Sequence, residues 1–408
     1  MNKLINIVYY IALLFLLSGS TIYIGPVTGG YFFCLMLLLL LLLNNSFTAF
    51  DKLMKLYLLF IFCFGLSSIV TGQINRFFDT FCRFYLVSFI LWEATCYVIK
   101  QNCKAIDTII LIFLGVGLLD ALVTLAQMTF QASVFDPIIS FLHLRQNEEM
   151  KSVMEYQLQH NSVFSYAITG IFVNAIRNGW YLAICVCLSM TYVLKYKKII
   201  LMILPSLYLL ALFACQERSA LFGSLLVLIY YLVKLCKVLN TYKKSILILL
   251  FAIFAVYGIA FFVSFSSAND MRYTLGFDDT GRFDILQGVG DYINNNPIFP
   301  NIYDFMTQGG SEPHNLFLNA FMYGGIISLL CITIIFIIQT KTCLGVALKY
   351  NDNNILVVSC AMALLFFTFN SFFHNQSVVT GEFVPWLLWA IVSDSLPIKS
   401  KGLSKEQA

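Results

Sequence analysis

Apolar runs long enough to cross a lipid bilayer recur along almost the whole chain. A spanning helix needs about 20 predominantly apolar residues. Only 11% of the 408 residues are charged, whereas a soluble domain carries roughly 25%. The sequence therefore excludes a soluble globule. It predicts an all-α polytopic membrane protein, with residues 1–408 forming a single integral membrane domain.

The hydropathy pattern predicts about twelve transmembrane helices, with both termini in the cytoplasm. We expect them at 4–23, 28–43, 53–72, 79–99, 106–130, 173–194, 199–215, 219–236, 245–265, 315–338, 355–371 and 378–394. The first run lacks a small-residue cleavage site, so we interpret it as a spanning helix and not as a signal peptide. Two long extracytoplasmic loops are expected at about 131–172 and 266–314, with short amphipathic helices at 135–142 and 282–294.

The basic residues divide between the two sides of this topology. Seventeen of the eighteen lysines fall in the predicted cytoplasmic segments, as the positive-inside rule requires. The remaining basic residues lie within helices or on the far side: Arg76, Arg83, Arg145, Lys151, Arg177, Arg218, Arg272 and Arg282. Because the arginine fork suits phosphate and carboxylate, the far side is expected to bind anions. The alternative is that each arginine pairs with a nearby Asp or Glu.

Pro313-His314-Asn315 stands where the second long loop enters the tenth expected helix. Histidine has an unperturbed pKa of about 6.5, so His314 beside an aqueous loop is a candidate general base. The alternative is a histidine that caps the helix entry or lies at the lipid headgroup level.

Two charged residues, Glu217 and Arg218, occupy a tight turn between the seventh and eighth expected helices. An ionisable group held close to the bilayer is a functional candidate. The alternative is that the two charges neutralise each other.

Arg282 follows a glycine turn in the second loop and can bind a phosphate through paired N–H donors. The adjacent Asp278 and Asp279 offer the alternative of a divalent metal site. The amphipathic helix that begins at Arg282 is expected to gather its apolar residues on one side: Phe283, Leu286, Val289 and Ile293.

The sixth expected helix opens with Asn174 and Arg177, which suit sugar hydroxyls or a phosphate. The alternative is an interfacial aromatic belt around Trp180 and Tyr181. A second rank of polar candidates lies in or near other expected helices: Asp79, Arg83, Glu93, Asp120, His374 and Glu382. Of these, Asp79 and Arg83 have the i,i+4 spacing of a helical ion pair, whereas His374 and Glu382 are expected near one outer cavity.

The twelve cysteines form no C-x-x-C pair, and most lie within apolar runs. We therefore expect them to pack in the interior and not to form disulfides or a zinc site.

Four local patterns give the chain a resemblance to the bacterial O-antigen polymerase and O-antigen ligase superfamily. They are Gly170…Asn174…Asn178-Gly179, Glu217-Arg218-Ser219-Ala220, Arg282 followed by Asn296-Pro297, and His314-Asn315 followed after nine residues by Gly325. The resemblance covers roughly residues 165–340. The chain departs from the family at Ser328, where Gly, Thr or Tyr is usual, and at Glu217, where a small hydroxyl residue is usual. The arginine–glycine spacing of some polymerase loops is also absent.

The resemblance implies glycosyl transfer on the periplasmic face of the bacterial inner membrane, from an undecaprenyl-pyrophosphate-linked oligosaccharide. It implies catalytic roles for His314, Arg218 and Arg282. The substrate-binding residues that it implies are Asn315, Arg177, Asn174, Arg272 and Glu217. No metal and no other cofactor is expected. The expected partners are membrane lipids and the pathway's chain-length regulator and flippase, with no nucleic acid.

Two other functions stay open at this point. A ligase would transfer the glycan to lipid A core, whereas a polymerase would transfer it to another lipid-linked repeat unit, and none of these residues identifies the acceptor. A transporter usually shows internal repeats and ionisable groups near the membrane midplane. Here the charged residues gather at the outer ends of the expected helices, which favours an enzyme.

Overall fold

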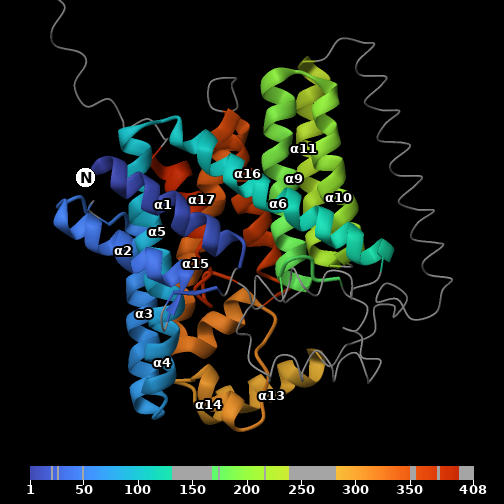
Figure 1. Ribbon diagram of the computed structural model, residues 1–408. Helices are drawn as coiled ribbons and strands as arrows, with labels where there is room; N and C mark the ends of the chain where they lie inside the picture. Colours follow the sequence, from blue (N-terminus) through green and yellow to red (C-terminus); the bar gives the residue numbers. More distant parts are fainter. Residues whose placement is uncertain are drawn as a thin grey trace, which may run out of the picture.

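The computed structural model describes residues 1–19, 22–24, 27–47, 50–130, 168–172, 175–215, 217–238, 282–349, 355–374 and 377–394. These residues are almost entirely helical (Figure 1). The first half contains α1 (Asn2–Leu17), α2 (Gly29–Leu43), α3 (Lys52–Val70), α4 (Ile74–Thr80), the π-helical turn η1 (Phe81–Tyr85), α5 (Leu86–Gln101) and α6 (Ala105–Phe130). A small antiparallel hairpin, β1 (Tyr23–Ile24) and β2 (Val27–Thr28), joins α1 to α2.

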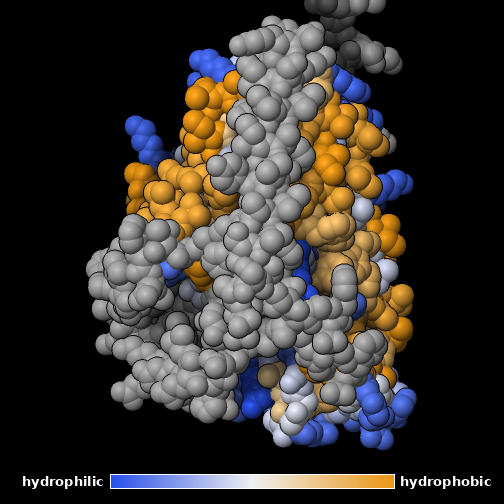
Figure 2. Space-filling view, turned by 90° about the vertical axis from the view of Figure 1, so that its right-hand side faces the viewer, coloured by the Kyte–Doolittle hydropathy of each residue, from blue (hydrophilic) through white to orange (hydrophobic). Residues whose placement is uncertain are grey.

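The second half contains α9 (Ala175–Tyr196), η3 (Ile199–Met202), α10 (Ile203–Cys215), α11 (Arg218–Val238), α13 (Arg282–Asn295), α14 (Ile302–Thr307), α15 (Leu316–Leu348), α16 (Ile355–Asn370) and α17 (Val384–Asp394). Six helical stretches of the described chain are long and apolar enough to cross a membrane: 52–70, 74–101, 105–127, 176–196, 218–237 and 316–348. Figure 2 shows apolar residues over the middle of one face and hydrophilic residues at its lower edge. The described chain is that of an all-α membrane protein.

Eleven of the twelve predicted spans fall within the described residues, and each coincides with a helix. The predicted span 245–265 and the predicted helix 135–142 lie outside the described residues. Several predicted ends were wrong. The first helix ends at Leu17, because the hairpin follows it; the last begins only at Val384; and the tenth continues to Leu348.

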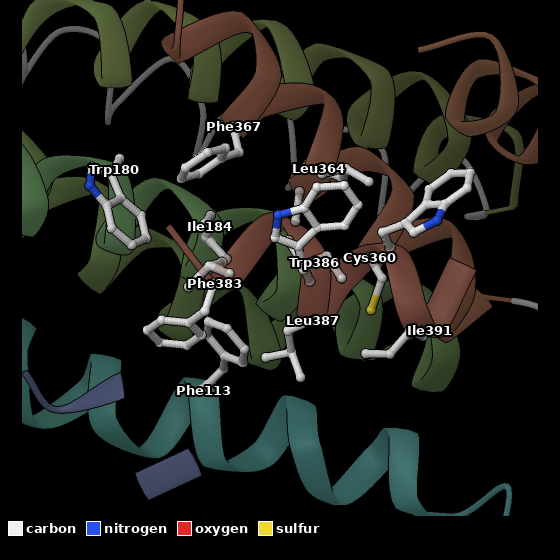
Figure 3. Packing of buried hydrophobic residues seen from close by; sticks show 14 of the residues in the cluster. Phe113, Trp180, Ile184, Cys360, Leu364, Phe367, Phe383, Trp386, Leu387 and Ile391 are labelled. Atoms are coloured by element: carbon white, nitrogen blue, oxygen red, sulfur yellow. The ribbon is translucent and has the colours of Figure 1, made fainter. Parts of the chain in front are cut away.

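The helix α9 lies at the centre of the bundle, in contact with α6, α10, α11 and α16. Its residues 178–191 are all buried, which explains why it carries small and polar residues among apolar ones. Figure 3 shows aromatic side chains of α9, α16 and α17 packed together. There the Trp180 and Phe367 rings meet edge to face, with centroids 5.4 Å apart.

The helix α15 packs along α3 and breaks near its start, at Gly324 and Gly325. Gly325 has a φ of +73°, a backbone conformation that glycine adopts without steric cost. A Cβ at this position would also lie 2.5 Å from the carbonyl oxygen of Ile298. The break therefore separates a short outer half, which starts just after His314, from the long apolar half.

The predicted amphipathic helix is present as α13, and it ends just before Asn296-Pro297. Its predicted apolar side was wrong at Leu286, which is 46% exposed, whereas Val289 is buried as expected. Asn301 fixes the following helix α14, because its side-chain oxygen accepts from the first backbone amides of that helix. The Asn301 amide donates to Ser67 and Ser68 of α3, which ties α14 to the bundle.

The lysines and the candidate site residues lie at opposite helix ends. Lys100, Lys195 and Lys237 occupy the last turns of α5, α9 and α11, where a cation complements the helix dipole. These ends point to the top of Figure 1, whereas α4, α13 and α14 lie at the bottom. Glu217 and His314 precede the starts of α11 and α15, at the other end of the bundle.

Candidate functional site

A buried acid–base pair forms where the turn between α10 and α11 meets the end of α16. The His374 Nε2 and a Glu217 carboxylate oxygen lie 2.8 Å apart. Each residue is only 3% exposed. Burying a carboxylate is costly unless it is paired and hydrogen-bonded, so this contact makes Glu217 tolerable in an apolar interior.

The hydroxyl of Ser219 joins this pair. Its Oγ lies 2.8 Å from the His374 Nε2 and 3.1 Å from the Glu217 oxygen, and it hydrogen-bonds the side-chain oxygen of Asn370. Since an ionised carboxylate only accepts hydrogen bonds, the His374 Nε2 is the donor toward Glu217. In the neutral ring the lone pair then lies on Nδ1, which is buried and has no hydrogen-bond partner among the described residues.

Gly179 of α9 makes room for the acid. A Cβ at Gly179 would lie 2.6 Å from the Cβ of Glu217. The glycine of the Asn178-Gly179 pattern therefore serves close packing between α9 and the turn that carries Glu217.

His314 lies beside this pair. Its ring meets the His374 ring nearly at right angles, with centroids 6.3 Å apart. The next residue, Asn315, caps α15: its side-chain oxygen accepts from the backbone amides of Phe317 and Leu318 at 3.0 and 3.1 Å. The cap holds the chain at His314 in place, so the structure gives Asn315 a positioning role. Its contact with a substrate stays a prediction.

Arg177 lies at the start of α9. Its guanidinium carbon is 5.5 Å from the centre of the Phe172 ring, and its Nε is buried without a hydrogen-bond partner among the described residues. Burial raises the pKa of the Glu382 carboxyl, and the charge of Arg177 opposes that rise. The charge of Arg177 therefore acts on Glu382 at the end of the bundle opposite the lysines.

The turn before α17 positions Glu382. Three hydroxyl groups from α3, η1 and α5 donate to its carbonyl oxygens: Tyr57 to Val378 (2.9 Å), Tyr85 to Val379 (2.5 Å) and Ser88 to Gly381 (2.9 Å). These bonds satisfy backbone groups that would otherwise be costly to bury. His374 follows α16 and Glu382 precedes α17, and their expected position near one cavity stays a prediction.

The segment before α9 is held by polar side chains of α6. The Gln127 amide exchanges two hydrogen bonds with the backbone of Gly170, at 3.0 and 3.2 Å. Asp120, buried in the same helix, accepts from the Ile171 amide at 3.0 Å. Asn178 donates to Thr124 of α6. Asp120 and the Gly170…Asn178 pattern therefore build the scaffold behind the site.

Some of the remaining predicted site residues lie within the described residues, and others do not. Arg218 is the exposed first residue of α11, directly after Glu217. Arg282 begins α13, and its side chain is outside the described part of the structure. Asn174, Arg272 and the proposed metal-binding Asp278 and Asp279 also lie outside the described residues. Within the described chain, no group of three or more His, Cys, Asp or Glu side chains is arranged to hold a metal ion.

The partners of the Glu217 carboxylate were not predicted from the sequence. For the tight turn only the adjacent Arg218 was considered as a partner of Glu217, and the structure sets the Glu217 carboxylate against His374. Ser219 was named only as part of the Glu217-Arg218-Ser219-Ala220 pattern, and Asn370 was not singled out. The available signal was the scarcity of histidine, four in the chain, with two of them at expected helix ends on the far side. Comparison with protein-family models, with curated proteins and with solved structures finds no significant match to this chain.

Proposed function

We propose that this protein transfers a glycan from an undecaprenyl-diphosphate-linked donor to a hydroxyl acceptor, extending O-antigen repeat units at the periplasmic face of the bacterial inner membrane. The observation that carries the proposal is the buried Glu217–His374 pair beside His314, at the helix ends opposite the lysines. The proposal includes twelve spans, cytoplasmic termini and extracytoplasmic loops at about 131–172 and 266–314.

His314 acts as the base in the proposed reaction. The acceptor oxygen bonds to the anomeric carbon of the donor, the bond from that carbon to the diphosphate oxygen breaks, and the acceptor proton passes to His314. The Glu217–His374 pair has a net charge of about −1 when His374 is neutral. It lies close enough to His314 to favour the imidazolium that forms.

Arginines stabilise the negative charge of the diphosphate leaving group. The diphosphate gains negative charge as the bond breaks, and fixed cations that face such a charge lower the barrier. Arg218 is exposed next to Glu217, and Arg177 begins α9 at the same end of the bundle. Arg282, Arg272 and Asn174 complete the proposed site together with the Nδ2 of Asn315, which the helix cap leaves available.

The test is deletion of the gene followed by complementation with His314→Ala, His374→Ala or the control His143→Ala, from the predicted first loop. Membrane fractions establish that each variant is inserted, and lipopolysaccharide gels display glycan length. We expect the first two variants to leave the core with one repeat unit and the control to restore the ladder. Loss of all O-antigen from the core would identify a ligase. A full ladder in both site variants would refute the assignment.

A further inference from the structure

A polar pocket lies between α4 and α14, and neither His314 nor His374 lines it. It has a volume of about 480 Å³, within the range of roughly 300–1,000 Å³ typical of small-molecule sites. Its lining combines one aromatic ring with donors and acceptors: Asn75, Arg76, Asp79, Thr80, Tyr303 and Met306. Asp79 was expected as a second-rank polar candidate and as the partner of Arg83, and the proposed reaction uses none of these residues.

The floor of this pocket is rigid. The hydroxyls of Tyr303 and Thr80 hydrogen-bond each other, which joins α14 to α4. The carboxylate of Asp304 accepts from the Tyr292 hydroxyl at 2.7 Å, which holds α13 against α14. Together with the Asn301 bonds to α3, these contacts fix the pocket before a ligand arrives, and a preformed site loses less entropy on binding.

The charges of the pocket are arranged to leave both a cation and an acceptor for a ligand. Asp79 receives a hydrogen bond from Arg83 on one oxygen, at 2.8 Å, so its other oxygen can accept from a hydroxyl. The Arg76 guanidinium lies over the Tyr303 ring, 5.8 Å from its centre, and forms no ion pair among the described residues. A π-helical turn follows Thr80 directly, and such turns recur at functional sites.

From these observations we infer that the pocket binds a saccharide unit. A sugar presents neighbouring hydroxyls that both donate and accept, which matches the mixture of Asn75, Arg76 and Asp79. A phosphate only accepts at its ionised oxygens, so the carboxylate of Asp79 disfavours it. That the saccharide is part of the growing glycan rests on the proposed function; saccharide binding itself does not.

The probe is the free oligosaccharide repeat unit, released by mild acid from the surface glycan of the cells that make this protein. Calorimetry on the purified, detergent-solubilised full-length protein measures its binding. We expect saturable binding that weakens at least tenfold in Asn75→Ala and in Arg76→Gln, both at exposed positions that tolerate substitution. Met306→Trp should block the pocket. Leu286→Trp and Gln287→Ala, exposed positions on α13 outside the pocket lining, are the matched controls.

Two further measurements separate this inference from the proposed function. His374→Ala should still bind the oligosaccharide with unchanged affinity, whatever its effect on glycan transfer. Inorganic phosphate should not compete. If the oligosaccharide does not bind, if the pocket variants bind it as well as the wild type, or if phosphate displaces it, the inference is wrong, even where glycan transfer is confirmed.

Discussion

The Glu217 carboxylate and the His374 Nε2 lie 2.8 Å apart although 157 positions separate the two residues in the chain. The contact joins the turn before α11 to the end of α16, so it is both a packing element and the centre of the proposed site. Its two roles can be separated by substitution.

Glu217→Gln should keep the shape of the site and remove its charge. The amide of Gln can still hydrogen-bond His374, so we expect the melting temperature to change little. Transfer activity should fall, because the neutral amide no longer favours the imidazolium of His314; the loss should not exceed roughly 10²–10⁴-fold, the usual contribution of the general base itself. Glu217→Ala should lose activity and also stability, by about 1–3 kcal/mol, because it leaves a buried imidazole N–H without an acceptor. Equal melting temperatures for the two variants would argue against this pairing.

Gly179→Ala tests the close packing behind the acid. The added methyl group would lie 2.6 Å from the Glu217 Cβ, and overpacking of this kind costs about 1–3 kcal/mol. Gly345→Ala is the matched control, since its added Cβ meets nothing within 4 Å and Ala is the better helix former. Thermal unfolding in detergent should show a lower melting temperature for the first variant only.

Gly325→Ala tests the break in α15. The backbone at Gly325, with φ +73° and ψ −159°, lies in a region that is essentially restricted to glycine and costs another residue about 1–3 kcal/mol, and the clash with Ile298 adds to that cost. We expect the outer half of α15 to move, and with it His314, so activity should fall more than stability. Hydrogen exchange of residues 316–323, compared with that of the long half of α15, measures the local effect.

Glu382 should make stability depend on pH. Its pKa in the folded protein is raised above the ordinary value of 4.5, so the folded state holds the proton more tightly than the unfolded state. The contribution of Glu382 to stability is therefore fully present below about pH 4.5 and is lost as the pH rises through its folded pKa. Glu382→Gln should remove this part of the decline. The prediction is contradicted if the melting temperature changes with pH between about pH 4.5 and 7 in the same way for the wild type and for Glu382→Gln.

The sequence predicted those features that depend on local spacing. Runs of apolar residues located the helices, and the i,i+4 spacing of Asp79 and Arg83 correctly predicted their ion pair. It placed helix ends less well: a short hairpin follows Leu17, and the turn before Val384 is held by hydroxyl groups of α3, η1 and α5 that are distant in the sequence. The exposure of Leu286 has a similar reason. One face of a short helix is buried only where a neighbouring element covers it, and for α13 that element is α14, which is not adjacent to Leu286 in the sequence.

The pairing of Glu217 with His374 could not be predicted, because no local pattern records which helix ends meet. Charge alone favoured the adjacent Arg218. From the sequence, capping of α15 was considered only as an alternative role for His314, whereas the structure assigns the cap to Asn315. Capping and substrate contact call for the same polar residue types at a helix start, so the pattern does not distinguish them.

Three consecutive residues at the start of α9 belong to three different clusters. Arg177 acts on Glu382, Asn178 bonds α6, and Gly179 packs on Glu217. Successive residues of a helix are rotated by about 100° about its axis, so three consecutive residues of α9 face three different neighbours. A small rotation or slide of this helix would therefore disturb all three clusters together.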